Sequence, residues 1–462
     1  MLQRRAEVLT LNLLATDGAA AHTVSTMRIV LTNSGTFGDI NPLIGLAIEL
    51  RRRGHQAVFA VPEMFRSNIG PLGFEFFQVR PNYDPSDTRL AEMIYDIKKG
   101  TERGLRELLF PAIKDSYGDL LAAVTHNGGA DLLLTGELAY AGPIVAEVTG
   151  VKWASYVLAP FSFFSAYDPP VLPPYPTLAR IQEHVPGTGH VVARFARWVT
   201  RDWPQPVYEL RKHLGLKPGP SPIFDAKHSH SLVLAMFPSA LGAPQPDWPA
   251  KTVVTGFVSY DGHQTANDVT GGNPGALTPA LENFLAAGPP PLVFTLGTAA
   301  VLNAGDFYEQ SAAVAVALNQ RALLLVGDDV RNMPSRALPD TVIAVRYAPY
   351  SLLFRRASLI IHQGGVGATS QALAAGKPML VVPYSHDQPD NARRVARMGV
   401  ARVIRRRDYT TRTVERELSA LLADTTAHAT ATRLGGRVAK EHGVDKACTA
   451  LELLDQLAFV SR

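Results

Sequence analysis

The segment from Ser358 to Asn391 combines residue types that could bind a phosphate with residue types that could bind a sugar. It reads SLIIHQGGVGATSQALAAGKPMLVVPYSHDQPDN. The pattern predicts a buried strand ending at His362, then a glycine-rich turn, then a helix to about Ala375. The free backbone N–H groups and the helix dipole at such a turn favour a phosphate, although many turns of this kind are only tight connections.

Polar side chains follow the next predicted strand of this segment. Asp387, Gln388 and Asn391 come directly after MLVVPY. Ligands of open parallel sheets bind at the carboxyl ends of the strands, and a carboxylate beside an amide suits a polyol. We therefore expect a sugar to be held here.

A second candidate turn lies near the start of the chain. The strand 27–33 is followed by SGTFGDINP and by an expected helix LIGLAIELRRR, which places Asp39 at the strand-to-helix junction. Asp caps helices well, and Pro42 would suit a first helical turn. Spacing alone leaves open whether Asp39 caps the helix or performs chemistry.

The elements that must position these residues form two series of short apolar runs alternating with amphipathic stretches. This alternation predicts an α/β fold with two doubly wound parallel-sheet domains. A segment rich in Gly, Asn, Asp and Thr separates the series and has the composition of a linker. The expected divisions are 1–26, an extension outside the fold; 27–258, the first domain; 259–279, the linker; 280–444, the second domain; and 445–462, a helix packing across the domains. The expected strands are 27–33, 56–61, 131–135, 153–158 and 231–236 in the first series, and 291–297, 322–327, 341–346, 358–364 and 379–384 in the second.

Composition excludes several classes of protein. Of the 462 residues, 46% are hydrophobic and 19% are charged, which excludes disorder for most of the chain. A formal net charge of +4 is too weak to indicate a nucleic-acid partner. A single cysteine, Cys448, favours a reducing compartment, so we expect a cytoplasmic protein. Residues 1–26 faintly resemble a signal peptide, but the apolar run is interrupted by charges.

Taken together, these motifs resemble the nucleotide-sugar-dependent glycosyltransferases of the GT-B fold. That family includes the plant UDP-glycosyltransferases and the bacterial sterol and antibiotic glucosyltransferases, and the resemblance is strongest to the rhamnolipid rhamnosyltransferase catalytic subunit. It runs through most of the chain after Met27. The matching segments include GDINPLIGLAIELRRRGH (38–55), PQPDWPAKTVVTGF (244–257), PLVFTLGT (291–298), GGVGA (364–368) and HDQPDNA (386–392).

The resemblance implies an inverting, single-displacement transfer in a cleft between an acceptor-binding domain, 27–258, and a nucleotide-sugar-binding domain, 280–444. Asp39 would be the base that deprotonates an acceptor hydroxyl, with an ordinary pKa of about 3.9 that makes it a weak base. In plant members a second carboxylate usually orients the base, but Gly136 stands at the matching position here, with Glu137 beside it, so a dyad is doubtful. The chain has no D-x-D triplet, so we expect no metal and no cofactor other than the nucleotide-sugar co-substrate.

The resemblance also assigns a donor site. Two departures from the family pattern, Gln363 in place of His and Gln371 in place of Glu, bring no charge and could alter nucleotide preference. His362 also fits a core histidine. The implied donor-binding residues are Gly297, Thr298, Tyr347, Ala348, His362, Gln363, Gly364, Gly365, Val366, Gly367, Ala368, Gln371, His386, Asp387 and Gln388.

An aromatic, proline-rich stretch within 159–222, predicted to be irregular, suits a lipophilic acceptor, although its aromatics could equally complete the core. The expected reaction moves rhamnose from dTDP-rhamnose, or glucose from UDP-glucose, onto a hydroxy fatty acid, sterol-like or phenolic acceptor. The alternatives are a non-catalytic nucleotide-sugar-binding protein and a sugar-nucleotide epimerase. The candidate acceptor residues are Phe161, Phe163, Phe164, Tyr167 and Tyr175.

Two runs of arginine could bring the protein to the inner face of a membrane. Residues 51–53 and 405–407 are each three consecutive arginines. Such runs are most often solvated faces, but either could meet an anionic lipid surface.

Overall fold

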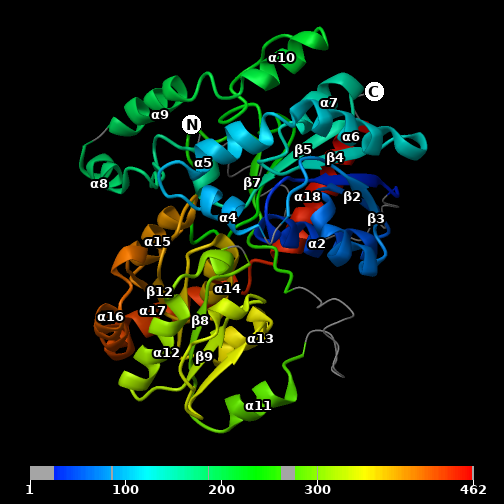
Figure 1. Cartoon of the computed structure of the whole chain (residues 1–462). Helices are drawn as coiled ribbons and strands as arrows, with labels where there is room; N and C mark the ends of the chain where they lie inside the picture. Colours follow the sequence, from blue (N-terminus) through cyan, green and yellow to red (C-terminus); the bar gives the residue numbers. More distant parts are fainter. Residues whose placement is uncertain (1–24, 85–86, 186, 262–275, 299, 460–462) are drawn as a thin grey trace.

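The computed structural model describes residues 25–84, 87–185, 187–261, 276–298 and 300–459. Two parallel sheets, one in each half of the chain, are flanked by helices (Figure 1). The first sheet has the order β3-β2-β1-β4-β5-β6-β7 and the second has the order β10-β9-β8-β11-β12-β13. The strands are β1 Arg28–Thr32, β2 Gln56–Val61, β3 Glu75–Gln78, β4 Leu132–Thr135, β5 Lys152–Val157, β6 Val233–Ala235, β7 Thr252–Val254, β8 Leu292–Thr295, β9 Ala322–Leu325, β10 Val342–Val345, β11 Leu359–His362, β12 Met379–Val381 and β13 Ala401–Val403.

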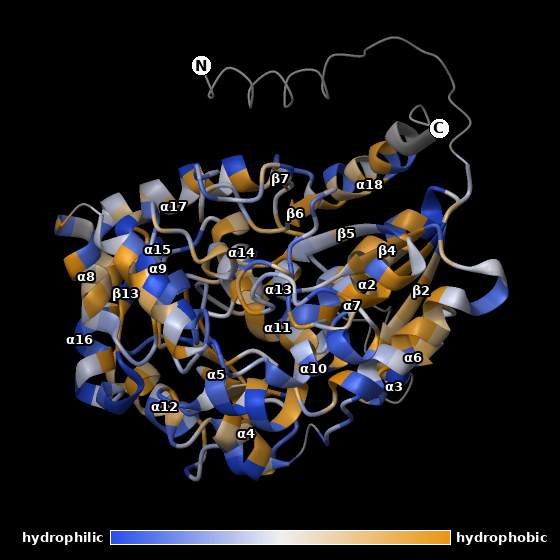
Figure 2. Ribbon diagram, turned by 90° about the horizontal axis from the view of Figure 1, so that it is seen from above, coloured by the Kyte–Doolittle hydropathy of each residue, from blue (hydrophilic) through white to orange (hydrophobic). Residues whose placement is uncertain are grey.

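The expected fold of two parallel-sheet α/β domains is confirmed, and all ten expected strands are present. Sequence patterning missed β3, β7 and β13, which all lie at sheet edges. An edge strand buries less of its surface, so it does not need the continuous apolar run that marks a central parallel strand. Figure 2 shows central strands such as β4 in apolar colours.

Helices connect and cover the strands of both sheets, as parallel pairing requires. In the first half the α-helices are α2 Phe37–Arg52, α3 Arg66–Ile69, α4 Thr88–Ile94, α5 Gly100–Arg103, α6 Ile113–Thr125, α7 Gly142–Thr149, α8 Pro176–His184, α9 Thr188–Val199 and α10 Gln205–His213. In the second half they are α11 Pro279–Ala286, α12 Phe307–Ala317, α13 Tyr350–Leu353, α14 Val366–Ala374, α15 Gln388–Arg397, α16 Thr411–Ala423, α17 Thr425–Val438 and α18 Gly443–Phe459.

Both strand orders reverse direction at one point, and this position fixes where ligands can bind. The reversal lies between β1 and β4 in the first sheet and between β8 and β11 in the second. Loops leaving the carboxyl ends of two such strands diverge and leave a crevice. The turn containing Asp39 follows β1, and the glycine-rich turn follows β11, so each candidate turn lies at a reversal point.

The proline-rich excursion after β5 is more regular than its composition predicted. Residues 159–222 contain α8, α9 and α10, so the expectation of an irregular insertion was wrong for most of this segment. Its prolines fall largely outside the helix interiors: Pro176 and Pro206 stand in first turns, where a missing N–H costs nothing.

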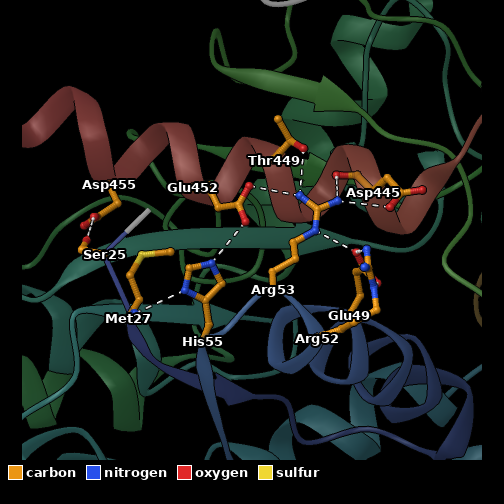
Figure 3. Close-up of polar contacts among 10 residues, drawn as sticks. All are labelled: Ser25, Met27, Glu49, Arg52, Arg53, His55, Asp445, Thr449, Glu452 and Asp455. Carbon is orange, nitrogen blue, oxygen red and sulfur yellow. Dashed lines mark hydrogen bonds and ion pairs between the residues drawn. The ribbon is translucent and has the colours of Figure 1, made fainter. Parts of the chain in front are cut away.

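The last helix, α18, packs against the first half of the chain, beside α2 (Figure 3). Arg53, at the end of α2, donates to Glu49 within its own helix and to Asp445 and Glu452 of α18. His55 bridges the backbone N–H of Met27, at 3.3 Å, and Glu452, at 3.2 Å. The chain therefore crosses between the halves a second time.

The two crossings touch each other. A Cβ atom on Gly443, the first residue of α18, would lie 2.5 Å from the carbonyl oxygen of Phe257, in the segment that leaves the first half. One on Gly256 would lie 2.7 Å from Glu441. The predicted linker 259–279 and the predicted extension 1–26 fall mostly on residues 262–275 and 1–24, which are outside the described residues.

Most arginines of the two arginine runs are engaged within the chain. Arg52 and Arg53 pair with Glu49, and Arg51 donates to the carbonyl of Leu72. Of the second run, Arg405 and Arg407 lie against Asp408, while Arg406 donates to Asn303. No helix in the described part of the chain is long and apolar enough to cross a membrane.

Candidate active site

Asp39 completes the cap of α2, but not in the way its position in the sequence suggested. The helix begins at Phe37, not near Leu43, and its N-cap is Thr36. The Thr36 side chain accepts from the N–H of Gly38, and Asp39 Oδ2 accepts from the N–H of Thr36 at 2.7 Å and from its hydroxyl at 3.1 Å. This is a capping box, with Asp39 in its third helical position.

The cap uses one carboxylate oxygen and leaves the other for chemistry. Both capping hydrogen bonds go to Oδ2. A Cβ atom on Gly35 would lie 2.2 Å from that same oxygen, so only glycine lets the backbone approach Asp39 this closely. Capping and catalysis are therefore compatible roles for this side chain.

Burial raises the pKa of Asp39 from 3.8 to about 6, against the hydrogen bonds from Thr36, and the negative charge of Glu137 raises it further. The expected pKa of an ordinary carboxyl group was therefore too low. A carboxylate with a pKa near 6 is a stronger base than an exposed one and is still mostly ionised at pH 7.

Glu137 does not form a hydrogen-bonded dyad with Asp39. Its carboxylate accepts from the Ser162 hydroxyl at 2.8 Å and pairs with Lys227 at 3.2 Å. It follows β4, on the other side of the strand reversal, and contributes negative charge.

Two polar residues that sequence reasoning missed hold the Asp39 turn in place. Asn33 donates to the Tyr156 hydroxyl at 2.9 Å, and that hydroxyl donates to the backbone carbonyl of Asp39 at 3.2 Å. Asn33 also accepts from the N–H of Leu138, beyond β4. Asn33 directly follows the first strand, and this position was the available signal.

The glycine-rich turn of the second half presents uncapped N–H groups at the start of α14. The N-cap is Gly365, which has no side chain to satisfy them. Gln363 lies across this turn: a Cβ atom on Gly297, after β8, would lie 2.3 Å from Gln363 Nε2. Gly297 has a φ of +66°, so the close approach and the backbone conformation both require glycine.

Buried polar atoms without a partner gather around this turn. Within the described residues, 13 buried side-chain atoms lack a hydrogen-bond partner, and five of them belong to 362–391. Buried polar groups are normally satisfied, so such a cluster marks a place where a ligand or water binds. The five are His362 Nε2, Gln363 Oε1, Ser370 Oγ, Gln371 Oε1 and Asn391 Oδ1.

His362 is neutral and helps to shape the turn. Its Nδ1 accepts from the N–H of Gly364 at 3.0 Å, and burial lowers its pKa to about 3. This agrees with a core histidine for one ring nitrogen, while the other, Nε2, is one of the buried atoms without a hydrogen-bond partner.

Asp387 and Gln388 differ in what remains available to a ligand. Gln388 is buried, and its Oε1 already accepts from the N–H groups of Tyr384 and Ser385. Asp387 is held by Asn391 at 2.7 Å. Burial raises the pKa of Asp387 to about 7 against that hydrogen bond.

Carboxylates of the two halves interact electrostatically. The charges of Glu137 and Asp39 contribute to the raised pKa of Asp387, although the first two belong to the other half of the chain. Asp39, Glu137 and Asp387 therefore lie close enough for their charges to interact, although they follow strands of different sheets.

His386 joins the donor loop to the first half. Its ring lies edge-on to Tyr95, with ring centroids 5.6 Å apart, and its Nδ1 lies 3.4 Å from the Thr101 hydroxyl. Burial lowers its pKa to about 4, so the ring is neutral at pH 7. The segment containing α4 and α5 thus covers the loop before Asp387, which sequence reasoning did not foresee.

The remaining expected donor residues follow their strands as predicted by position. Thr298 lies exposed after β8, while Tyr347 is half-buried and Ala348 is buried after β10. Val366, Gly367 and Ala368 form the first turn of α14. Their roles toward a donor stay predictions.

The five expected acceptor aromatics differ in their burial and in the residues that they contact. Phe163 stacks on Trp248, with centroids 4.1 Å apart, and belongs to the core. Phe161 packs against that core and Phe164 packs edge-on against Phe224. Tyr167 and Tyr175 are more than half exposed. Among the described residues, no group of three or more acidic, His or Cys side chains is placed to hold a metal ion.

Comparison with known proteins identifies the family. Residues 285–448 match the family described as the erythromycin biosynthesis protein CIII-like C-terminal domain. The whole chain is 30% identical over 436 residues to the O-mycaminosyltylonolide 6-deoxyallosyltransferase of Streptomyces fradiae, covering 92% of this chain and 97% of that one. The chain belongs to the GT-B glycosyltransferases of the antibiotic and macrolide type.

Solved structures of glycosyltransferases share the fold. The spinosyn forosaminyltransferase aligns with a TM-score of 0.66 at 20% identity, over 93% of this chain and 100% of that one. The glycosyltransferase VinC, solved in complex with DTDP, aligns with a TM-score of 0.62 at 20% identity over the same shares. Membership of this GT-B family supports a transferase over the non-catalytic and epimerase alternatives.

Proposed function

We propose that this glycosyltransferase moves a deoxyhexose from a dTDP-linked donor onto a hydroxyl group of a lipophilic, macrolide-like acceptor, with inversion at the anomeric carbon. The observation that carries the proposal is the electrostatic interaction between Asp39 of the first half and Asp387 of the second, together with the uncapped start of α14 that follows the other reversal point. A base, a sugar contact and an anion site are the three parts that such a displacement needs.

The first half of the chain would activate the acceptor. Asp39 Oδ1, which takes no part in the capping box, accepts the proton of the acceptor hydroxyl as its oxygen attacks the anomeric carbon. The raised pKa of about 6 brings the base closer to the working pH and strengthens it. Asn33 and Tyr156 keep the turn at a fixed position during the attack.

The second half would stabilise the leaving group. The bond between the anomeric carbon and the diphosphate oxygen breaks, and the nucleoside diphosphate leaves with the electron pair. The first-turn N–H groups of α14 and the Gln363 amide would meet its negative charge. In this proposal, N–H groups rather than a cation meet the charge of the diphosphate.

Two observations favour a deoxyhexose and a dTDP donor. The Streptomyces fradiae relative is named as a 6-deoxyallosyltransferase, and VinC was solved with DTDP. Within the site, Gln388 Oε1 already accepts hydrogen bonds from the loop backbone. The Asp387 carboxylate is therefore the acceptor that would bind sugar hydroxyls. A sugar with fewer hydroxyl groups fits such a site. The relative's acceptor, O-mycaminosyltylonolide, supports a macrolide-like acceptor over a hydroxy fatty acid.

The test is mass-spectrometric detection of product formed by the purified full chain. dTDP-rhamnose, another dTDP-6-deoxyhexose and UDP-glucose would each be offered with a macrolide aglycone, a hydroxy fatty acid and a phenol. We expect a mass gain of one deoxyhexose on the macrolide from a dTDP donor. A gain of one hexose from UDP-glucose alone would overturn the donor assignment, and product only on the fatty acid would overturn the acceptor assignment.

Stereochemistry is read from the same product. Proton NMR of the new glycosidic bond should show the anomeric configuration opposite to that of the donor. Retention of configuration would contradict a single displacement by the activated hydroxyl.

A further inference from the structure

Helix α9 carries a stripe of large apolar side chains that the rest of the chain leaves uncovered. Val191, Phe195 and Trp198 are spaced at i, i+4 and i+7, so they share one face of the helix. They are 68%, 59% and 58% exposed, and Val199 beside them is 45% exposed. The Phe195 and Trp198 rings lie side by side, with centroids 5.8 Å apart. We call these four residues the α9 stripe.

The charges around the stripe have one sign on the helix itself. Residues 188–201 contain three arginines and no Asp or Glu. At 100° per residue, Arg194, Arg197 and Arg201 fall along one border of the stripe. Arg197 pairs with Asp225 and Arg201 with Asp202, while Arg194 has no ion-pair partner in the described part of the chain.

The α9 stripe lies at the outer edge of the first half, at the upper left of Figure 1. Its helix is anchored to a loop that leads to the cleft: a Cβ atom on Gly189 would lie 2.0 Å from the carbonyl oxygen of Ala166. Two residues further along that loop, Asp168 pairs with Arg394 of the second half. A surface that holds α9 would therefore hold the excursion beside the cleft.

We infer that the α9 stripe docks the enzyme on an anionic lipid bilayer. An aromatic and aliphatic face bordered by arginines is the composition of a helix that lies in the membrane interface, with its rings among the acyl chains and its cations at the headgroups. A second copy of the chain fits less well, because a two-fold contact through this face would bring the same cations together. The inference does not depend on which sugar or acceptor the enzyme uses.

Trp198 reports on the contact directly. Of the four tryptophans, Trp248 is buried and Trp153 and Trp203 are partly buried, which leaves Trp198 as the strongly exposed one. We expect its emission to shift to shorter wavelength when the full chain meets vesicles of equal parts phosphatidylglycerol and phosphatidylcholine. Brominated acyl chains should quench it, and vesicles of phosphatidylcholine alone should give a weaker effect that added salt does not change.

The decisive variant keeps Trp198 and replaces two other apolar residues of the α9 stripe. Val191→Ser with Phe195→Ser should lower vesicle partitioning at least tenfold in sedimentation, whereas the control Val330→Ser, at an 83% exposed valine of the second half, should leave it unchanged. Circular dichroism would show that both variants fold. The inference is overturned if the emission does not shift on anionic vesicles or if the double variant partitions like the wild type. A wild-type dimer in sedimentation velocity that the double variant abolishes would also overturn it and assign the stripe to self-association.

Discussion

The two halves of this glycosyltransferase differ in how the polar groups of their strand-to-helix turns are satisfied. Each places a strand-to-helix turn at the reversal point of a parallel sheet. In the first half the turn is satisfied from within, since Thr36 and Asp39 cap α2 reciprocally and Asn33 and Tyr156 hold the backbone. In the second half the turn around Gly365 is left uncapped and is surrounded by unpartnered polar atoms.

This difference indicates what each half contributes. A reacting group has to be held still before the substrate arrives, and the proposed base, Asp39, is fixed by the protein's own hydrogen bonds. An anion site has to exchange its protein contacts for ligand contacts, so its donors are kept free. Variants in the first half should therefore affect the chemical step, and variants in the second half should affect donor binding.

The largest expected effect comes from replacing the proposed base in the first half. Asp39→Asn keeps the size of the side chain and one acceptor oxygen for the cap but removes the base. We expect kcat to fall at least 100-fold, because general base catalysis contributes about 10² to 10⁴. dTDP affinity, measured by calorimetry, should stay within twofold of the wild type.

Thr36→Ala separates capping from catalysis at the same turn. It removes the threonine side of the capping box, which costs about 1 kcal/mol of stability, and leaves the carboxylate. Its kcat should stay within about tenfold of the wild type. Equal losses in Thr36→Ala and Asp39→Asn would mean that Asp39 is only a helix cap.

The next largest effect lies in the second half. Gln363→Ala removes the amide that lies over Gly297 and the start of α14. We expect the KM for the donor and the Kd for dTDP to rise about tenfold, since a hydrogen bond to a charged group contributes about 1.5–3 kcal/mol. Gln205→Ala, at an exposed glutamine of α10, is the matched control. A fall in kcat with an unchanged KM would contradict the division between the halves.

The pH dependence of kcat/KM sharpens the comparison. Asp39 must be ionised to act, so kcat/KM should fall about tenfold per pH unit below its pKa of about 6. The residual activity of Asp39→Asn should lack this acid limb. A wild-type profile that stays flat down to pH 4.5 would exclude a base with the raised pKa that burial gives Asp39.

The smallest expected effect is on stability. Folding raises the pKa of Asp39 to about 6 and that of Asp387 to about 7, both from 3.8. A carboxyl group with a raised pKa stabilises the fold below its unfolded pKa, and this contribution is lost as the pH rises through the folded value. The wild type should therefore lose about 1–3 kcal/mol of stability between pH 4 and pH 8 that a variant with Asn at either position does not lose. Calorimetric melting of both proteins at both pH values measures this difference. Asp340→Asn, at an exposed turn, should show no such difference.

Much of this architecture could be predicted from the sequence, because central parallel strands and glycine-rich turns leave local patterns. The apolar runs located all the interior strands, and the positions of Asp39 and Asp387 at strand ends followed from them. Three of the four edge strands, β3, β7 and β13, were missed because edge strands bury less surface. The start of α2 was misplaced because Phe37 and Gly38 have no helical pattern of their own, and the capping box became evident only from the contacts of Thr36.

What could not be predicted depends on contacts between distant segments. Tyr95 and Thr101 reach His386 across almost three hundred residues, and no local pattern marks them. The raised pKa values arise chiefly from burial, which depends on how distant segments pack around the two carboxyl groups. Which of the candidate acceptor aromatics belong to the core was equally hidden from the sequence, since Phe163 stacks on Trp248 in the core whereas Tyr175 is exposed.

The contact between the two chain crossings has a mechanical consequence. Gly443 and the Gly256–Phe257 backbone touch, so the covalent connections between the halves converge on one small pivot. Any rotation of one half against the other moves atoms in proportion to their distance from that pivot, as a lever does. The distant rim of the cleft can then open widely while the pivot residues barely shift, and a side chain added at Gly443 would act as a wedge that changes the resting angle of the whole molecule.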